Sequence, residues 1–325
     1  MGLRKRAIFL TLGAFALVAH AGTASEQRFP SKPVTLVVGS AAGGGMDIIA
    51  RLLAAKLSES LGQPVVVDNR PGAAARIANQ FVARAPADGY TLLVNTAVGI
   101  VDTSSEGRSP LDSLRDFAPV STIASSAMIL VVNPKVPATN LLALVARARA
   151  LPGTLNYSSS GVGTTGNLYG EFFKLRTGTD IVHVPYKGTA PALSALLAGD
   201  VEMSFVPVPG VLQHIRAGRL RALATTGDRR SPLVPDVPTM DEAGAPGAAA
   251  SVWYGLFAPA STPRDAIDIL ARAVADASRS ADFRQRLQNM GAEPVSSTPA
   301  DFDSLLRDEA ARWSDLIKAA GVRPE

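Results

Sequence analysis

Short apolar runs alternate with amphipathic stretches along most of the chain. Runs rich in Val, Leu and Ile are typical of buried strands, and apolar residues spaced three and four apart are typical of helices. We predict strands at 33–38, 64–67, 91–94, 128–132, 155–157, 181–184, 201–205 and 220–224. We predict helices at 48–57, 77–85, 141–150, 168–174, 192–198 and 211–217, and a mostly helical tail from 263. This alternation predicts βαβ units, mostly parallel sheets and two similar α/β lobes.

The N-terminal segment has the pattern of an export signal. A basic stretch, residues 1–6, precedes the apolar stretch 7–19, which is shorter than the ~20 residues that span a bilayer. Small residues at 19–24 suit cleavage after Ala21 or Ala24. We therefore predict a signal peptide at 1–24 and a mature protein in the periplasm, with an uncleaved anchor as the alternative.

Composition narrows the function classes. The chain has 325 residues, and removing the three basic residues of the leader lowers its formal net charge from +4 to +1. No mature segment concentrates basic residues, so we expect no nucleic-acid partner. The chain has 0 cysteines, which excludes disulfides, thiolate metal sites, a thiol nucleophile and a lipid-modified N-terminal cysteine.

A glycine-rich segment, Gly39-Ser-Ala-Ala-Gly-Gly-Gly45, lies between a predicted strand and a predicted helix. The free N–H groups and positive end of such a helix attract anions. It is neither a Walker loop nor a G-x-G-x-x-G motif, and a tight structural turn is the alternative. Asp47 can cap the helix or pair with Arg51 four residues later.

The segment Ser158 to Thr165 has the same placement in the second half of the chain. Its hydroxyl and N–H groups can donate to a carboxylate, and Asn167 can donate its amide or cap the helix. A solvated Ser-rich loop is the alternative. Since ligands of α/β sheets gather at the carboxyl ends of strands, the two loops together predict a cleft that holds a small anion.

Candidate catalytic groups are few. Beyond the leader the chain has only His183 and His214, and His183 lies in an apolar strand, where a core role is the simpler interpretation. Lys187 is a candidate Schiff-base lysine, but nothing near it in sequence suggests the desolvation or the partner that would activate it. We find no metal-ligand spacing and no nucleophile motif, so we expect no metal, no cofactor and no enzymatic activity.

Many ordered motifs resemble one family, the Bug-type extracytoplasmic solute receptors of tripartite tricarboxylate transporters. They cover essentially the whole mature chain. The motifs are Phe29-Pro-Ser-Lys-Pro33, Gly43-Gly-Gly-Met-Asp47 with Ala50-Arg51, Leu61-Gly-Gln-Pro-Val-Val-Val-Asp-Asn-Arg-Pro-Gly72, Asp88-Gly-Tyr-Thr-Leu-Leu93, Asp116-Phe-Ala-Pro-Val120, Tyr157-Ser-Ser-Ser-Gly-Val-Gly163, His183-Val-Pro-Tyr-Lys-Gly188, Gly218-Arg-Leu-Arg-Ala-Leu-Ala224 and Pro235-Asp-Val-Pro-Thr239.

This resemblance implies an α/β fold of the type II periplasmic binding proteins, with two doubly wound lobes and a ligand cleft between them. We expect residues 25–127 plus 252–292 in lobe 1 and 128–251 plus 293–325 in lobe 2. The implied ligand is a small carboxylate, such as a dicarboxylate, an amino acid or an aromatic acid. The implied partner is a tripartite tricarboxylate-type membrane permease or a sensor domain, and we expect a monomer.

Carried over by position, the resemblance implies a ligand site made of two arms and one cleft-edge residue. The expected ligand-binding residues are Ser40, Ala41, Gly43, Gly44, Gly45, Asp47, Thr96, Ser158, Ser159, Ser160, Gly161, Gly163, Thr164 and Asn167. An exported enzyme using Lys187, His183 or Asp47, and a scaffold without a ligand, remain as alternatives.

The chain departs from the family pattern at four places. Val38-Gly-Ser-Ala-Ala42 replaces a Val-Pro-Phe and proline pair, and Asn167 replaces a frequent histidine. Ala195 replaces a common aspartate, and Val206-Pro-Val-Pro209 replaces a polar loop. These changes make the expected cleft more apolar, which disfavours citrate and favours an aromatic or longer-chain acid.

Overall fold

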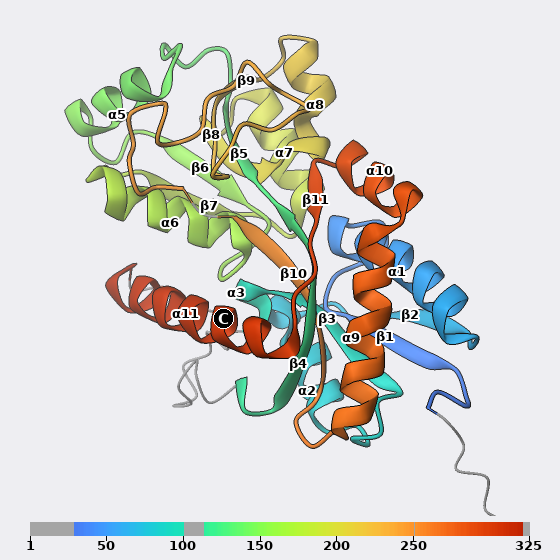
Figure 1. Ribbon diagram of the computed structural model, residues 1–325. Coiled ribbons are helices and arrows are strands. Elements are labelled where there is room, and N and C mark those ends of the chain that lie inside the picture. Colours follow the sequence, from blue (N-terminus) through green and yellow to red (C-terminus); the bar gives the residue numbers. More distant parts are fainter. Residues whose placement is uncertain (1–28, 101–113, 250, 321–325) are drawn as a thin grey trace, which may run out of the picture.

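The computed structural model describes residues 29–100, 114–249 and 251–320, and the predicted signal peptide lies outside them. The two lobes of the molecule are each built on a mixed β-sheet with helices packed against it (Figure 1). The first lobe is built on a six-stranded sheet of order β11-β4-β10-β3-β1-β2, and the second on a five-stranded sheet of order β7-β6-β8-β5-β9. The two-lobed α/β fold expected from the sequence is confirmed.

The strands of the six-stranded sheet are β1 (Val34–Val38), β2 (Val65–Asn69), β3 (Thr91–Thr96), β4 (Phe117–Ser126), β10 (Val252–Pro259) and β11 (Ala292–Pro294). The strands of the second lobe are β5 (Met128–Val132), β6 (Asn156–Ser159), β7 (Val182–Pro185), β8 (Met203–Pro207) and β9 (Arg221–Thr225).

The helices that follow the first-lobe strands are α1 (Gly45–Leu61), the short 3-10 helix η1 (Ala73–Ala75), α2 (Arg76–Ala83), α3 (Ala97–Ile100), α9 (Arg264–Arg279) and α10 (Ala281–Asn289). The second lobe has α5 (Leu141–Ala150), α6 (Thr165–Thr177), α7 (Thr189–Ala198) and α8 (Val208–Arg216), and the chain continues into α11 (Pro299–Ala320). None of the helices within the described ranges combines the length and apolarity needed to cross a membrane.

The sequence predicted mostly parallel sheets, but both sheets of the structure contain parallel and antiparallel pairs. Strand β1 pairs in parallel with β2 and β3, and β6 pairs in parallel with β7 and β8. Strand β10, however, runs antiparallel to both β3 and β4, and β5 runs antiparallel to β8 and β9. Strand β4 leads the chain into the second sheet and β10 brings it back, so these two neighbours must run in opposite directions.

Burial explains why these segments form strands and helices. Every residue of β10 is buried, and β1 is buried on both faces, as expected for a strand covered by helices on each side. In α1, buried residues recur every three to four positions along the face that packs on the sheet, and Gly62 ends the helix in the left-handed conformation.

Helix α11 contacts both lobes (Figure 1). Near its start, Phe302 packs on Phe257 with ring centroids 5.0 Å apart, and a Cβ on Gly255 would lie 2.1 Å from the Phe302 ring. Further along, Trp313 packs on Tyr169 of α6 with centroids 5.7 Å apart. The residue boundaries of the two lobes, with 293–325 in lobe 2, stay a prediction.

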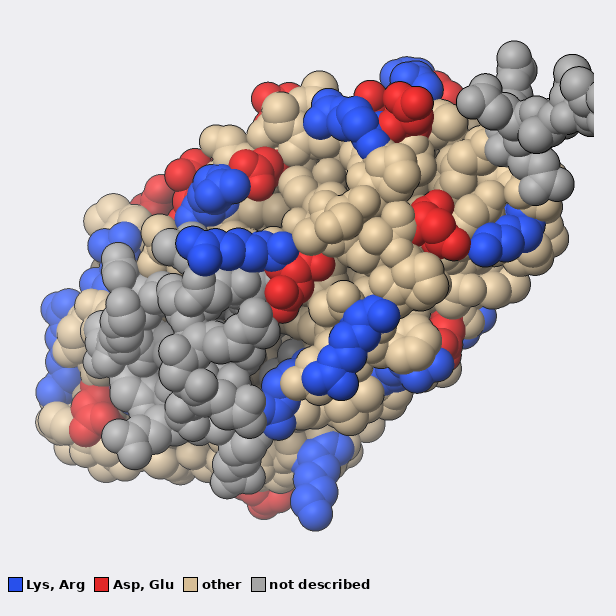
Figure 2. All heavy atoms as spheres, turned by 90° about the horizontal axis from the view of Figure 1, so that it is seen from below, with Lys and Arg blue, Asp and Glu red and all other residues tan. Residues whose placement is uncertain are grey.

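Charged side chains of both signs are spread over the face in Figure 2. In the described part of that face, Lys and Arg lie among Asp and Glu with uncharged residues between them. This view shows no continuous basic surface of the kind that a nucleic-acid backbone requires.

Candidate functional site

A cavity of about 280 Å³ lies between the lobes and is lined by both of them. The first lobe contributes Gly39, Ser40, Gly45, Met46, Ala75, Asn95, Thr96, Gly99, Val252 and Tyr254 to its lining. The second lobe contributes Met128, Ser159, Ser160, Gly163, Thr164, Thr165, Gly166, Thr189, Ala192, Ser204, Phe205, Val206 and Pro207. The N-terminal turns of α1 and α6 therefore open into the same cavity.

The first of these turns is formed by the glycine-rich loop. Gly43 has a φ of +82°, which favours glycine, and Gly44 is the extended N-cap residue of α1. No side chain caps this helix. The N–H groups of Gly45, Met46 and Asp47 have no acceptor within the helix, because their acceptors would precede its start. These donors can therefore serve an anion.

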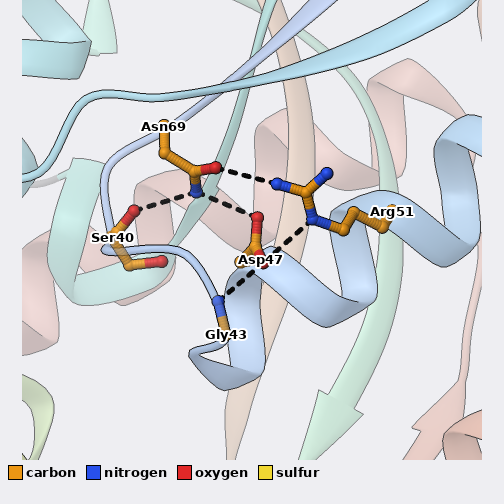
Figure 3. A network of polar contacts seen from close by, with 5 residues as sticks. All are labelled: Ser40, Gly43, Asp47, Arg51 and Asn69. Atoms are coloured by element: carbon orange, nitrogen blue, oxygen red, sulfur yellow. Dashed lines mark hydrogen bonds and ion pairs between the residues drawn. The ribbon is translucent and has the colours of Figure 1, made fainter.

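The Asp47 carboxylate holds this loop in place (Figure 3). Its Oδ2 accepts hydrogen bonds from the Gly43 N–H at 2.8 Å and from Arg51 Nε at 3.0 Å. Its Oδ1 accepts from Asn69 Nδ2 at 2.9 Å, and the same amide nitrogen donates to the Ser40 carbonyl at 3.1 Å. Burial opposes ionisation of Asp47, but the bonds from Arg51, Gly43 and Asn69 outweigh it and keep the pKa below its usual value.

The second loop repeats this arrangement in the other lobe. Gly163 has a φ of +73° and Thr164 is the extended N-cap residue of α6. The Gly163 N–H donates to Asn167 Oδ1 at 2.9 Å, and Asn167 Nδ2 donates to Tyr157 Oη at 2.9 Å. Tyr157 in turn donates to Glu171 Oε1 at 2.7 Å. Burial, together with Glu171, raises the pKa of Tyr157, so this phenol keeps its proton.

His183 contacts two residues of the second loop and its supporting strand, Tyr157 and Ser159. Its ring stacks on Tyr157 with centroids 4.9 Å apart, and its Nε2 lies 2.7 Å from the Ser159 hydroxyl. Burial lowers the pKa of His183, and the nearby Lys174 adds to this while Glu171 opposes it. The imidazole is therefore neutral at pH 7, which fits a packing role.

The structure brings half of the expected ligand-binding residues to the cavity wall. Those that line it are Ser40, Gly45, Thr96, Ser159, Ser160, Gly163 and Thr164. The others, namely Ala41, Gly43, Gly44, Asp47, Ser158, Gly161 and Asn167, belong to the same loops or their supports but lie outside that lining. The contacts of all these residues with a ligand stay a prediction.

Several lining residues were not expected from the sequence. Val252 and Tyr254 come from β10, Met128 begins β5, and Phe205 lies near the end of β8. Val206 and Pro207, which the sequence did place at the cleft, also line the cavity. The fully apolar run at 252–259 was the available signal, since it is typical of a buried strand. The described lining contains no Asp, Glu, Lys, Arg or His.

The described side chains do not form a metal-binding cluster. Across residues 29–100, 114–249 and 251–320, no group of three or more His, Asp or Glu side chains is placed to hold a metal ion. The donors that the cavity does offer are hydroxyl and N–H groups, which suit an anionic organic ligand better than a cation.

Comparisons with known proteins agree with this geometry. The family described as tripartite tricarboxylate transporter family receptor matches residues 49–322. Protein BugT of Bordetella pertussis is 38% identical over 321 residues, which cover 97% of this chain and 98% of the relative.

Solved structures agree as well. A structure described as an R. palustris protein with adipate is 38% identical, with a TM-score of 0.81, and the match covers 91% of this chain and 100% of the other. The structure of MatC from Rhodopseudomonas palustris with bound malate is 31% identical, with a TM-score of 0.78 and coverage of 89% and 100%. The chain thus belongs to the receptors of the tripartite tricarboxylate transporter family, which are periplasmic solute-binding proteins.

Proposed function

We propose that the protein captures one small carboxylate between its lobes and releases it chemically unchanged. The observation that carries this proposal is that the N-terminal turns of α1 and α6, one from each lobe, open into one cavity. Each turn offers free backbone N–H groups and a positive helix end, worth ~0.3–1 kcal/mol for an exposed anion and up to ~2 kcal/mol in a partly buried site.

The cavity wall indicates what the ligand looks like between its ends. Met46, Met128, Phe205 and Val206 line the cavity, and no charged side chain accompanies them in the described lining. A third carboxylate in the middle of the ligand would therefore be desolvated without a partner, at a large cost. The related structures with adipate and malate have dicarboxylates bound. These observations favour a mono- or dicarboxylate, aliphatic or aromatic, over citrate.

The same loops define the proposed contacts. Ser40, Gly45 and Thr96 would meet one end of the ligand, and Ser159, Ser160, Gly163 and Thr164 the other. Asp47 and Asn167 would act through the loops that they hold, because their side chains bond to Gly43 and Gly163.

The residues that the structure describes give the enzymatic alternative no assembled set of catalytic groups. Lys187 is exposed, and neither it nor His183 nor Asp47 belongs to the cavity lining. The carboxylate of Asp47 is engaged by Arg51 and Asn69, and the ring of His183 by Ser159. A receptor without catalytic activity is therefore the function that the geometry supports.

Family membership extends the proposal to location and partners. A periplasmic receptor of this family would carry a cleaved signal peptide at 1–24 and deliver its ligand to a tripartite tricarboxylate-type permease or to a sensor domain. We propose that it does so as a monomer, since the cavity is completed by the two lobes of one chain.

A ligand screen on the exported, purified protein tests the proposal. Thermal unfolding is measured with succinate, adipate, malate, benzoate, hexanoate and citrate, and the acid is then recovered and analysed by mass spectrometry. A ligand at 100 times its Kd stabilises the folded protein by ~2.7 kcal/mol, which gives a readable shift. Absence of any shift, or recovery of a changed product, would contradict the proposal.

A further inference from the structure

Tyr254 lies in the cavity wall, and its hydroxyl has no hydrogen-bond partner among the residues that the structure describes. It lies on β10 opposite Thr96 of β3, and it is only 9% exposed. Within the described part of the chain, no hydrogen bond to its hydroxyl is present. The hydroxyl lies at the surface of the cavity rather than enclosed in the protein, so a ligand or an ordered water in the cavity can accept its hydrogen bond.

The Tyr254 hydroxyl lies beside the first turn of α1. A Cβ built on Gly45 would be 4.0 Å from Tyr254 Oη, so the phenol faces the open side of this glycine. The Ser40 hydroxyl is also buried and unpartnered, and it lies 3.8 Å from a Cβ built on Gly44. Two hydroxyl donors therefore flank the free N–H groups at this end of the cavity.

On this basis we propose that Tyr254 determines specificity at the first-lobe end of the cavity, by donating its hydroxyl hydrogen to a carboxylate oxygen of the ligand. The inference rests on the proposed function, because it assigns one contact within the proposed carboxylate site. The ligand class that follows is a dicarboxylate whose second carboxylate reaches α1 while the first is held at α6.

The chemistry of the phenol suits this role. Burial raises the pKa of Tyr254 to about 12, so the hydroxyl keeps its proton at neutral pH and can donate it. The α6 end has no phenol in the described lining and offers the smaller hydroxyls of Ser160, Thr165 and Thr189. The two ends of the cavity therefore differ in the donors that they offer to the carboxylates of a ligand.

The test compares Tyr254→Phe with the unaltered protein, using adipate and hexanoate as probes in isothermal calorimetry. These acids have the same chain length, and hexanoate lacks the second carboxylate. We expect Tyr254→Phe to weaken adipate binding at least tenfold, as for a lost donor to a charged acceptor. Hexanoate binding should weaken less than threefold, because its single carboxylate can occupy the α6 end.

A matched control and a second variant separate this role from a structural one. Tyr90→Phe removes a hydroxyl that bonds to the Ser31 N–H at 2.9 Å, away from the cavity, and should leave both affinities unchanged. Ser40→Ala should weaken adipate binding in the same selective way as Tyr254→Phe. Thermal stability of unliganded Tyr254→Phe should not fall, because the lost hydroxyl bonds to none of the described residues.

Each outcome decides something. Equal losses for adipate and hexanoate, or no loss for either, would overturn the role of Tyr254 while leaving the receptor function intact. Loss of unliganded stability in Tyr254→Phe with unchanged adipate affinity would also overturn it. If the unaltered protein binds no acid in the screen above, the proposed function itself fails, and that result is distinct from the others.

Discussion

Asp47 and Asn167 occupy equivalent positions in the two lobes. Each is the third residue of a helix, and each accepts a hydrogen bond from the N–H of the glycine four residues earlier, at 2.8 Å and 2.9 Å respectively. The two glycines have similar left-handed φ values of +82° and +73°. The same local structure therefore holds both loops of the cavity, one in each lobe.

The different side chains at these positions follow from their surroundings. Asp47 meets donors on both oxygens, from Gly43 and Arg51 on one and from Asn69 on the other. Asn167 meets a donor at its oxygen and an acceptor at its nitrogen, because the Tyr157 hydroxyl already donates to Glu171. A carboxylate therefore suits the first lobe and an amide suits the second.

The variant Asn167→Asp tests this complementarity. A carboxylate at 167 would face the Tyr157 oxygen without a donor, so we expect the free energy of unfolding to fall by ~1–3 kcal/mol at pH 7.5. The new carboxyl group can donate when protonated, so its pKa in the folded protein should be raised. The loss should therefore shrink as the pH falls through that raised pKa.

Urea unfolding of this variant and of the unaltered protein at pH 7.5 and 4.5 measures the effect. A loss of the same size at both pH values would contradict the assigned direction of the hydrogen bond between Asn167 and Tyr157.

Gly45→Val tests the anion site at α1 directly. The added Cβ would point toward the Tyr254 hydroxyl and meet nothing closer than 4.0 Å, so the variant should fold. Its branched side chain would cover the free N–H groups, and we expect carboxylate affinity to fall at least tenfold, ~1.4 kcal/mol or more. Calorimetry with the best acid of the screen measures this.

Gly210→Val is the matched control for that variant. Gly210 also lies in a helix, is exposed, and would place a Cβ in open space. The carboxylate affinity of Gly210→Val should be unchanged. Equal affinities in both variants would remove the first turn of α1 from the site.

The sequence was most informative where strand, loop and helix follow each other within a short stretch. The loop 39–45 and the loop 158–165 both precede helices in the structure, as expected. The helices α1 and α6, however, begin at Gly45 and Thr165, each three residues before the predicted start. Their first turns contain glycine and threonine, which carry no helical apolar pattern, so periodicity could not place the start of either helix within its loop.

The cavity itself could be predicted only in part. Tyr254 is separated from Thr96 by more than 150 positions, and the two become neighbours only because β10 pairs antiparallel with β3. A return strand of this kind is a long-range pairing, and local patterns do not specify its partner or register. The roles of Asp47 and Asn167 as loop supports likewise depend on Asn69 and Tyr157, which lie on other segments.

Stability should depend on His183 between pH 7.5 and 5.5. Burial keeps its pKa in the folded protein below that of the unfolded chain, which is ~6.5. The unfolded state therefore binds more protons in the window between these two values. The free energy of unfolding should fall as the pH drops below ~6.5 toward the lowered pKa.

His183→Gln removes this titration while its amide can still bond to Ser159. Urea midpoints at pH 7.5, 6.5 and 5.5 should therefore change less with pH in His183→Gln than in the unaltered protein. Identical pH profiles for the two proteins would assign the dependence to other groups.

Trp313 packs helix α11 against the second lobe. Its side chain is only 2% exposed, and it packs on Tyr169 and Phe172 of α6 with centroids 5.7 Å and 6.5 Å away. Truncation of a buried tryptophan costs ~3–5 kcal/mol, so Trp313→Ala should lower the free energy of unfolding by about that amount. Leu175→Ala is the control. Leu175 lies on α6, like Tyr169 and Phe172, but it is 49% exposed, so its truncation should lower the free energy of unfolding far less.

The effect of Trp313→Ala should also be local. Phe302 still packs on Phe257 at the other end of α11, so hydrogen exchange should speed up near residue 313 and stay slow near residue 302. A uniform increase along the whole helix would show that α11 is released as one unit. Protection unchanged at both ends would mean that Trp313 does not fasten the helix, and that Phe302 alone is sufficient to hold it.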